Sequence, residues 1–265
     1  MGMAEGAVVL GKRRGRAREL AAPAICFRQA TGAASAALQG VGRDCVMVGE
    51  RIRRLSLFHP RHRMQSVPAA TFDQAYYQRF YFNKKTRVVD AAHAERLSAF
   101  LAAYLQYLRL PVRRVLDMGC GIGLWRELIA RHFPGASYHG VEISDYLCQR
   151  YGWEHGSVID YAARTPFDLV ICQGVLPYLN PPDLRRALAN LGRLSRGALY
   201  IEAVSREDYE RDVIDEELTD ARQFRHRAAL YRRGLREHML ELGGGVWLSR
   251  QAEVPLFALE YMGGS

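Results

Sequence analysis

Three closely spaced glycines end an apolar run, where residues 115–125 read VLDMGCGIGLW. Gly119, Gly121 and Gly123 permit a tight turn and let a ligand approach the bare backbone, so this loop is a candidate binding cradle. A dinucleotide fingerprint would need glycine instead of leucine at position 124. Asp117, just before the loop, would repel a pyrophosphate and suits a ligand that carries an ammonium or sulfonium charge.

A second acid, Glu142, closes the next apolar segment and lies 19 residues after Gly123. At this position relative to a glycine loop, a carboxylate can accept hydrogen bonds from both hydroxyls of a ribose. Ser157 and Val158 end the third apolar segment, and Gln173 ends the fourth, which leads to the mouth of the predicted sheet. The four groups of residues together are more specific than the glycine loop alone.

The elements that position these residues alternate between strand-like and helix-like patterns. We predict strands over residues 112–118, 137–143, 155–158, 167–172 and 197–204, and helices over residues 124–133, 145–151 and 181–194. This alternation implies right-handed crossovers and a mainly parallel sheet that helices cover on both faces. Because only about eight residues join the third strand to the fourth, we expect at most one helical turn there.

Three further segments flank this alternation. Residues 71–82 hold six aromatics, and the next stretch, 90–110, has the apolar spacing of an amphipathic helix. Residues 205–240 carry an acidic block and then a basic block, which we interpret as a helical insertion with opposed charge. After three glycines, the apolar segment 246–248 and a last strand around 255–261 are predicted to form a terminal antiparallel pair.

The motifs, in this order and spacing, resemble those of the class I S-adenosylmethionine-dependent methyltransferases over roughly residues 72–203. The resemblance implies an α/β fold with a Rossmann-like, seven-stranded, mostly parallel sheet, an antiparallel terminal strand inserted between neighbours, and helices on both faces. It also implies a helical N-terminal cap at 72–110 and a helical insertion before the last strands. The implied cofactor is S-adenosyl-L-methionine.

The resemblance assigns the amino-acid end of the cofactor to Asp117 and to the backbone of residues 119–123, which includes Cys120. We interpret Cys120 as a small residue chosen for space, although a cysteine in a loop could also be a nucleophile. Glu142 would bind the ribose and Ile143 would pack on the adenine.

Three further positions complete the implied site. Ser157 and Val158 would lie near the adenine amine, and Gln173 would line the methyl-transfer opening. The family often has Asp at the position of Ser157, which makes this residue a departure. No triad or metal cluster is visible in the sequence, and we name no catalytic base and no metal ligand.

The aromatic cluster and a proline motif could bear on the acceptor. The cluster packs as core or contributes Tyr76, Tyr77 and Tyr81 to the pocket, where Tyr178 is a further candidate. Residues 180–182 read Asn-Pro-Pro, but this motif lies about seven residues later than in the DNA and protein amide-nitrogen methyltransferases. We therefore interpret it as a turn and helix N-terminus.

The net charge of +9 is concentrated at the beginning of the chain. Residues 1–63 hold 12 Lys and Arg against 4 Asp and Glu, whereas the remainder holds 25 against 24. We divide the chain into a basic N-terminal segment at 1–66, expected to be disordered, and a methyltransferase domain at 67–265. The basic segment could be a nucleic-acid-binding arm, a targeting arm or the product of a start codon upstream of Met64.

The sequence favours methyl transfer to a small-molecule acceptor, since the basic segment lacks the aromatic interleaving of a nucleic-acid-binding arm. The alternatives are an RNA, DNA or protein methyltransferase, and a cofactor-binding regulatory or assembly protein without catalysis. Five scattered cysteines without a C-x-x-C motif fit a reducing compartment. No apolar run is long enough to span a bilayer, so we expect no membrane partner and a cytoplasmic location.

Overall fold

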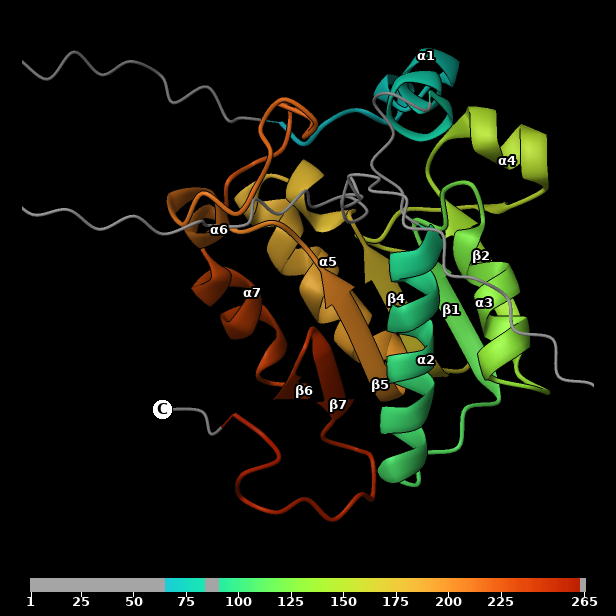
Figure 1. Ribbon diagram of the computed structural model, residues 1–265, viewed down its shortest axis with the longest axis vertical. Helices are drawn as coiled ribbons and strands as arrows, with labels where there is room; N and C mark the ends of the chain where they lie inside the picture. Colours follow the sequence, from blue (N-terminus) through green and yellow to red (C-terminus); the bar gives the residue numbers. More distant parts are fainter. Residues whose placement is uncertain (1–64, 84–90, 263–265) are drawn as a thin grey trace, which may run out of the picture.

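The computed structural model describes residues 65–83 and 91–262, so the basic segment up to Met64 lies outside the described residues. Seven strands form one sheet in the order β3-β2-β1-β4-β5-β7-β6 (Figure 1). The strands are β1 (Arg114–Met118), β2 (Ser137–Glu142), β3 (Glu154–His155), β4 (Phe167–Gln173), β5 (Ser195–Glu202), β6 (Met239–Gly243) and β7 (Val246–Ser249). β1 to β5 pair in parallel, whereas β7 lies antiparallel between β5 and β6. The predicted sheet class is confirmed.

Helices cover both faces of this sheet. They are η1 (Ala69–Thr71), α1 (Gln74–Tyr77), η2 (Gln78–Phe82), α2 (Ala91–Tyr107), α3 (Leu124–His132), α4 (Asp145–Tyr151), η3 (Leu176–Tyr178), α5 (Pro181–Leu194), α6 (Arg206–Glu210) and α7 (Ala228–Leu235). α2 and α3 bury Leu101 and Ile129 in one core cluster, whereas α5 and α7 bury Leu188 and Leu235 in the other. These four helices therefore bury apolar side chains against the sheet.

The helices next to the site begin and end at capping residues. The Ser144 side chain accepts a hydrogen bond from the Leu147 amide at the start of α4, and Gly152 ends that helix with a positive φ of 72°. At the start of α5, the Asn180 side chain accepts from the Asp183 amide at 2.9 Å. Both Asn-Pro-Pro prolines, Pro181 and Pro182, lie in the first turn of α5, where proline loses no helical hydrogen bond.

The predicted last strand at 255–261 is wrong, because these residues form no strand. The antiparallel pair is β6 and β7, and of the three glycines at 243–245 the first ends β6 while Gly244 and Gly245 form the hairpin turn. The φ angles of the three glycines, 92°, 59° and 78°, all lie in the left-handed region that glycine adopts without strain. β3 is also shorter than predicted and ends at His155, and residues 156–166 contain no helix.

The charged insertion at 205–240 is helical only at its ends, in α6 and α7, and residues 211–227 between them are irregular. Its acidic and basic blocks contact each other through Arg225 and Glu216 at 2.6 Å and Arg227 and Glu207 at 3.9 Å. The irregular part packs back onto the domain, since the Phe224 amide donates to the carbonyl of residue 177. It thereby reaches the same end of the sheet as the N-terminal cap.

The beginning of the described chain also packs onto the sheet. The Ser66 hydroxyl donates to the Asp183 carboxylate at 2.6 Å and accepts from the Asn180 amide at 2.9 Å. Ser66 therefore contacts the domain, although the predicted boundary placed it in the N-terminal segment. Figure 1 shows the segment from here to α1 lying over the carboxyl ends of the parallel strands.

Candidate functional site

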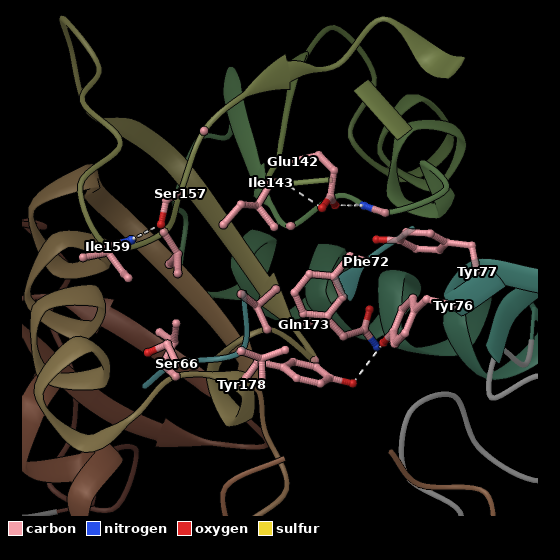
Figure 2. A pocket seen from close by; sticks show the side chains of 18 of the residues that line it. Ser66, Phe72, Tyr76, Tyr77, Glu142, Ile143, Ser157, Ile159, Gln173 and Tyr178 are labelled. Atoms are coloured by element: carbon pink, nitrogen blue, oxygen red, sulfur yellow. Dashed lines mark hydrogen bonds between the residues drawn. The ribbon is translucent and has the colours of Figure 1, made fainter. Parts of the chain in front are cut away.

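A pocket lies between the carboxyl ends of β1, β2 and β4 and the segment 65–83 (Figure 2). Most of the residues predicted for the site line it: Tyr77, Tyr81, Gly119, Gly121, Glu142, Ile143, Ser157, Val158, Gln173 and Tyr178. Asp117, at the end of β1, and the loop residues Cys120 and Gly123 do not line the cavity. A pocket outside the carboxyl ends of parallel strands is the usual ligand position in such a sheet.

The glycine loop joins β1 to α3 and uses its glycines for different reasons. A side chain at Gly119 would collide with Val175, since its Cβ would come within 2.2 Å of that residue. A Cβ at Gly121 would meet no atom closer than 4.0 Å, so it would point into open space. Gly123 begins α3 with a φ of 81°. Gly121 is thus the position where a side chain would occupy the cradle itself.

Glu142 holds this loop in place from the end of β2. Its carboxylate accepts hydrogen bonds from the amides of Gly121 at 2.8 Å, Ile143 at 2.9 Å and Ser144 at 3.0 Å. The side chain is buried, and burial raises its pKa while the three amides lower it. A carboxylate has about four acceptor positions, so about one remains for a ligand hydroxyl. Capture of both ribose hydroxyls would require the loop amides to give up a bond.

Asp117 lies under the loop and is only 1% exposed. The Tyr138 hydroxyl donates to it at 2.6 Å, and burial raises its pKa to about 7 despite that bond. Cys120 is also buried, and burial raises the pKa of its thiol. A thiol in this state is a poor nucleophile, which agrees with the interpretation of Cys120 as a small packing residue. The roles of both residues in ligand binding stay predictions.

The opposite side of the pocket is an aromatic lid, which we define as Phe72, Tyr76, Tyr77, Tyr81 and Tyr178. Phe72 packs edge-on against both Tyr76 and Tyr178, with ring centroids 5.1 Å apart in each case. The Tyr76 and Tyr178 hydroxyls are 2.9 Å apart and share a hydrogen bond, visible as a dashed line in Figure 2. The cluster is therefore both packed and part of the pocket wall.

The charged insertion supports this lid from outside. Gln223 donates to the Tyr178 hydroxyl at 3.3 Å, and the Arg222 guanidinium lies over the Tyr76 ring at 5.4 Å. Burial raises the pKa of Tyr76 and, to about 12, that of Tyr178. Both hydroxyls therefore keep their protons at neutral pH. Sequence reasoning missed Gln223, because no motif marks a residue of an irregular segment.

Gln173 ends β4 at the floor of the pocket, and its amide is held at both ends. The Trp125 indole donates to its oxygen at 2.8 Å, and its nitrogen donates to the Glu202 carboxylate at 3.0 Å. Indole can only donate and a carboxylate can only accept, so this chain of bonds determines the orientation of the amide.

Glu202 is the second residue that sequence reasoning missed. One of its oxygens also accepts from the Tyr200 hydroxyl at 3.1 Å, whereas the other is buried without a partner among the described residues. Burial raises the pKa of Glu202 to about 7, although the two bonds lower it. Its place near the end of the predicted strand 197–204 is the signal that could have found it, and in the structure it ends β5 in register with Gln173.

The strand order and the glycine-loop pocket define a Rossmann-like methyltransferase-type domain. A family model described as "Methyltransferase domain" matches residues 89–246, and the chain belongs to this family. The resemblance to class I S-adenosylmethionine-dependent methyltransferases is thereby confirmed.

Curated relatives match over shorter stretches. The chain is 30% identical over 99 residues to a trans-aconitate 2-methyltransferase of Pseudomonas paraeruginosa, which covers 29% of this chain and 36% of the relative. It is 31% identical over 112 residues to a ubiquinone biosynthesis O-methyltransferase of Hahella chejuensis, with 37% and 45% covered. The matches thus span less than half the length of these relatives.

A solved structure matches over a larger share of the chain, with lower sequence identity. Magnesium protoporphyrin IX methyltransferase from Synechocystis PCC 6803 with bound SAH has a TM-score of 0.48 and 18% identity, and the match covers 67% of this chain and 94% of that one. The described residues contain no helix that is long and apolar enough to cross a membrane.

Proposed function

We propose that the protein transfers a methyl group from S-adenosyl-L-methionine to a small-molecule acceptor. The observation that carries this proposal is one pocket with two unlike sides, a glycine loop on the sheet and an aromatic lid over it. The family match and the methyltransferase relatives support the reaction class.

The residues present fit this cofactor. Gly121 leaves open space where any side chain would stand, and Glu142 keeps about one acceptor position free for a ribose hydroxyl. Ile143, Ser157 and Val158 line the same end of the pocket and are suited to the adenine. The buried carboxyl groups of Glu142 and Asp117 favour a ligand with positive charge over a pyrophosphate.

The cofactor supplies a methyl group already activated by its sulfonium leaving group, so the protein has to align the acceptor and exclude water. Gln173 lines the pocket at the end of β4, with its amide orientation determined by Trp125 and Glu202. The aromatic lid shields that position from solvent and offers ring surfaces to an acceptor.

Calorimetry with the full chain tests the cofactor, with S-adenosylmethionine and its demethylated product S-adenosylhomocysteine as titrants. We expect both to bind, and absence of binding by both would refute the proposal. Methylation of a size-fractionated cell extract with radiolabelled cofactor tests the acceptor. Label in the small-molecule fraction supports the proposal, whereas label confined to protein or nucleic acid contradicts the acceptor class.

A cytoplasmic location belongs to the same proposal. It is supported by five cysteines that are scattered along the sequence without a C-x-x-C motif. Fractionation of cells followed by immunodetection tests it, and recovery in the membrane or the extracellular fraction would contradict it.

A further inference from the structure

Trp153 does not line the pocket; it lies in the chain between α4 and β3 and contacts the glycine loop. Two glycines leave the space that its ring occupies. A Cβ at Gly123 would come within 2.6 Å of the indole, and a Cβ at Gly140 of β2 would come within 2.9 Å. A single side chain therefore packs against both the loop and the strand beside it.

The indole also bonds to the residue that forms the cradle. Its Nε1 donates to the carbonyl oxygen of Gly121 at 2.9 Å. The amide of Gly121 donates to Glu142 at 2.8 Å. Both backbone polar groups of Gly121 are thus satisfied by side chains from outside the loop, at a residue whose φ is 54°. Glycine has more conformational freedom than any other residue. The two hydrogen bonds to its backbone therefore restrict Gly121 to one conformation.

The ring is itself held by its neighbours. The Arg126 guanidinium of α3 lies over the indole at 5.2 Å from the ring centroid. Tyr138 packs edge-on against the indole, with centroids 6.2 Å apart, and its hydroxyl is the donor to Asp117. Trp153 is therefore in contact with the groups that position both the loop and the acid beneath it.

We propose that Trp153 is a positioning residue of the cofactor site, which keeps the Gly121 peptide in the conformation that leaves the cradle open. This inference rests on the proposed function, since it takes the glycine loop as the part of the pocket that binds the cofactor. Trp153 does not line the cavity, so it acts through the loop and not by contact with the ligand.

The substitution Trp153→Phe tests this inference because it removes the N–H donor and keeps an aromatic ring. We expect the dissociation constant for S-adenosylhomocysteine, measured by calorimetry with the full chain, to rise about five- to tenfold, as for loss of one ordinary hydrogen bond. Hydrogen–deuterium exchange of the backbone amides at 119–123 should become faster without ligand. Trp247→Phe is the matched control, since Trp247 is buried in β7 and takes no part in the loop.

Two readouts keep the outcomes separate. If the wild-type chain binds S-adenosylhomocysteine and Trp153→Phe binds it equally well, Trp153 only fills space and the inference is overturned. If the wild-type chain does not bind it, the proposed function fails, and the exchange rates decide alone whether Trp153 holds the loop. Exchange at 119–123 that is unchanged by Trp153→Phe, or equally fast in Trp247→Phe, also overturns it.

Discussion

The two sides of the pocket are held together by different kinds of contact. The glycine loop on the sheet is fixed by side chains that bond to its backbone, as Glu142 and Trp153 do at Gly121. The aromatic lid is held largely by side chains that contact each other, as in the hydrogen bond between Tyr76 and Tyr178, although the Ser144 hydroxyl also donates to the carbonyl of Phe72. We expect the loop to tolerate almost no substitution at Gly121. In the lid, by contrast, a single hydroxyl of Tyr76 or Tyr178 can be removed while the ring stays in place.

This difference suits a site with one constant and one variable ligand. Under the proposed function, the loop presents backbone groups to the cofactor, and these groups are the same for every residue type and for every acceptor. Contacts between side chains of the lid, the segment 65–83 and the insertion can change with each substitution, so under the proposed function we expect that side to set acceptor specificity.

The largest expected effect is that of a substitution in the glycine loop. Gly121→Val places a branched side chain in the open space of the cradle, and we expect binding of S-adenosylhomocysteine to weaken at least about a hundredfold in calorimetry. Circular dichroism should show that the sheet and helices are retained.

The matched control is Gly152→Val at the end of α4. Gly152 also has a positive φ, of 72°, and no atom within 4 Å of a Cβ, but it does not line the pocket. The two variants share the backbone strain of a branched residue in the left-handed region. Equal loss of binding in both would show that strain, and not occupancy of the cradle, is the cause.

The next effect concerns Glu202, which bonds to Gln173 on the sheet side and whose charge helps to raise the pKa of Tyr81 in the lid, where burial is the main cause. The pKa of Glu202 in the folded state is about 7, above its ordinary value of 4.5, so the folded protein binds this proton more tightly than the unfolded chain. The resulting stabilisation is fully present below pH 4.5 and is lost as the pH rises through 7.

Unfolding by urea between pH 4.5 and 8 measures this stabilisation in the wild type and in Glu202→Gln, which lacks the titration. We expect the wild type to lose up to about 3 kcal/mol of unfolding free energy relative to the variant over that range. Asp117 titrates in both proteins and cancels. If the unfolding free energies of the two proteins changed equally with pH, Glu202 would not be the group with the raised pKa.

The smallest effect alters the lid. Tyr178→Phe leaves the Tyr76 hydroxyl and Gln223 without their common partner, which should cost about 1–3 kcal/mol of unfolding free energy. The double variant with Tyr76→Phe should cost less than the sum of the two single variants, because both ends of the bond are then removed. Additive costs would contradict the shared hydrogen bond.

Binding of S-adenosylhomocysteine to the lid variants tests whether the glycine loop and the aromatic lid act independently. If the two sides of the pocket work independently, Tyr178→Phe should change that affinity far less than Gly121→Val does. A comparable loss of affinity in calorimetry would mean that the lid contributes to the cofactor side as well.

The sheet side could be predicted from the sequence because its determinants are local. Glycine spacing, alternation of apolar residues and the acid at Glu142 place the loop and the strands within a few residues of their observed bounds. The end of the sheet was misplaced because three glycines fit either a loop before a hairpin or the hairpin turn itself. Only the pairing of Leu240 with Leu248 decides between them.

The lid could be predicted only in part, since its contacts join residues far apart in the sequence. Tyr76 and Tyr178 are 102 positions apart, and Gln223 belongs to a segment without helical or strand periodicity. Trp153 was equally hard to predict, because its contacts depend on two glycines of different elements, Gly123 at the start of α3 and Gly140 in β2. No local sequence pattern predicts the contacts of such residues.

The chain of bonds from Trp125 through Gln173 to Glu202 has a consequence for the acid–base character of the pocket floor. With Glu202 ionised, the oxygen that has no partner in the described part of the chain can only accept a hydrogen bond. When Glu202 takes up a proton, which its pKa of about 7 allows near neutral pH, the same oxygen can carry a hydrogen and donate. One proton thus reverses the hydrogen-bonding polarity of this corner while the Gln173 amide keeps its orientation.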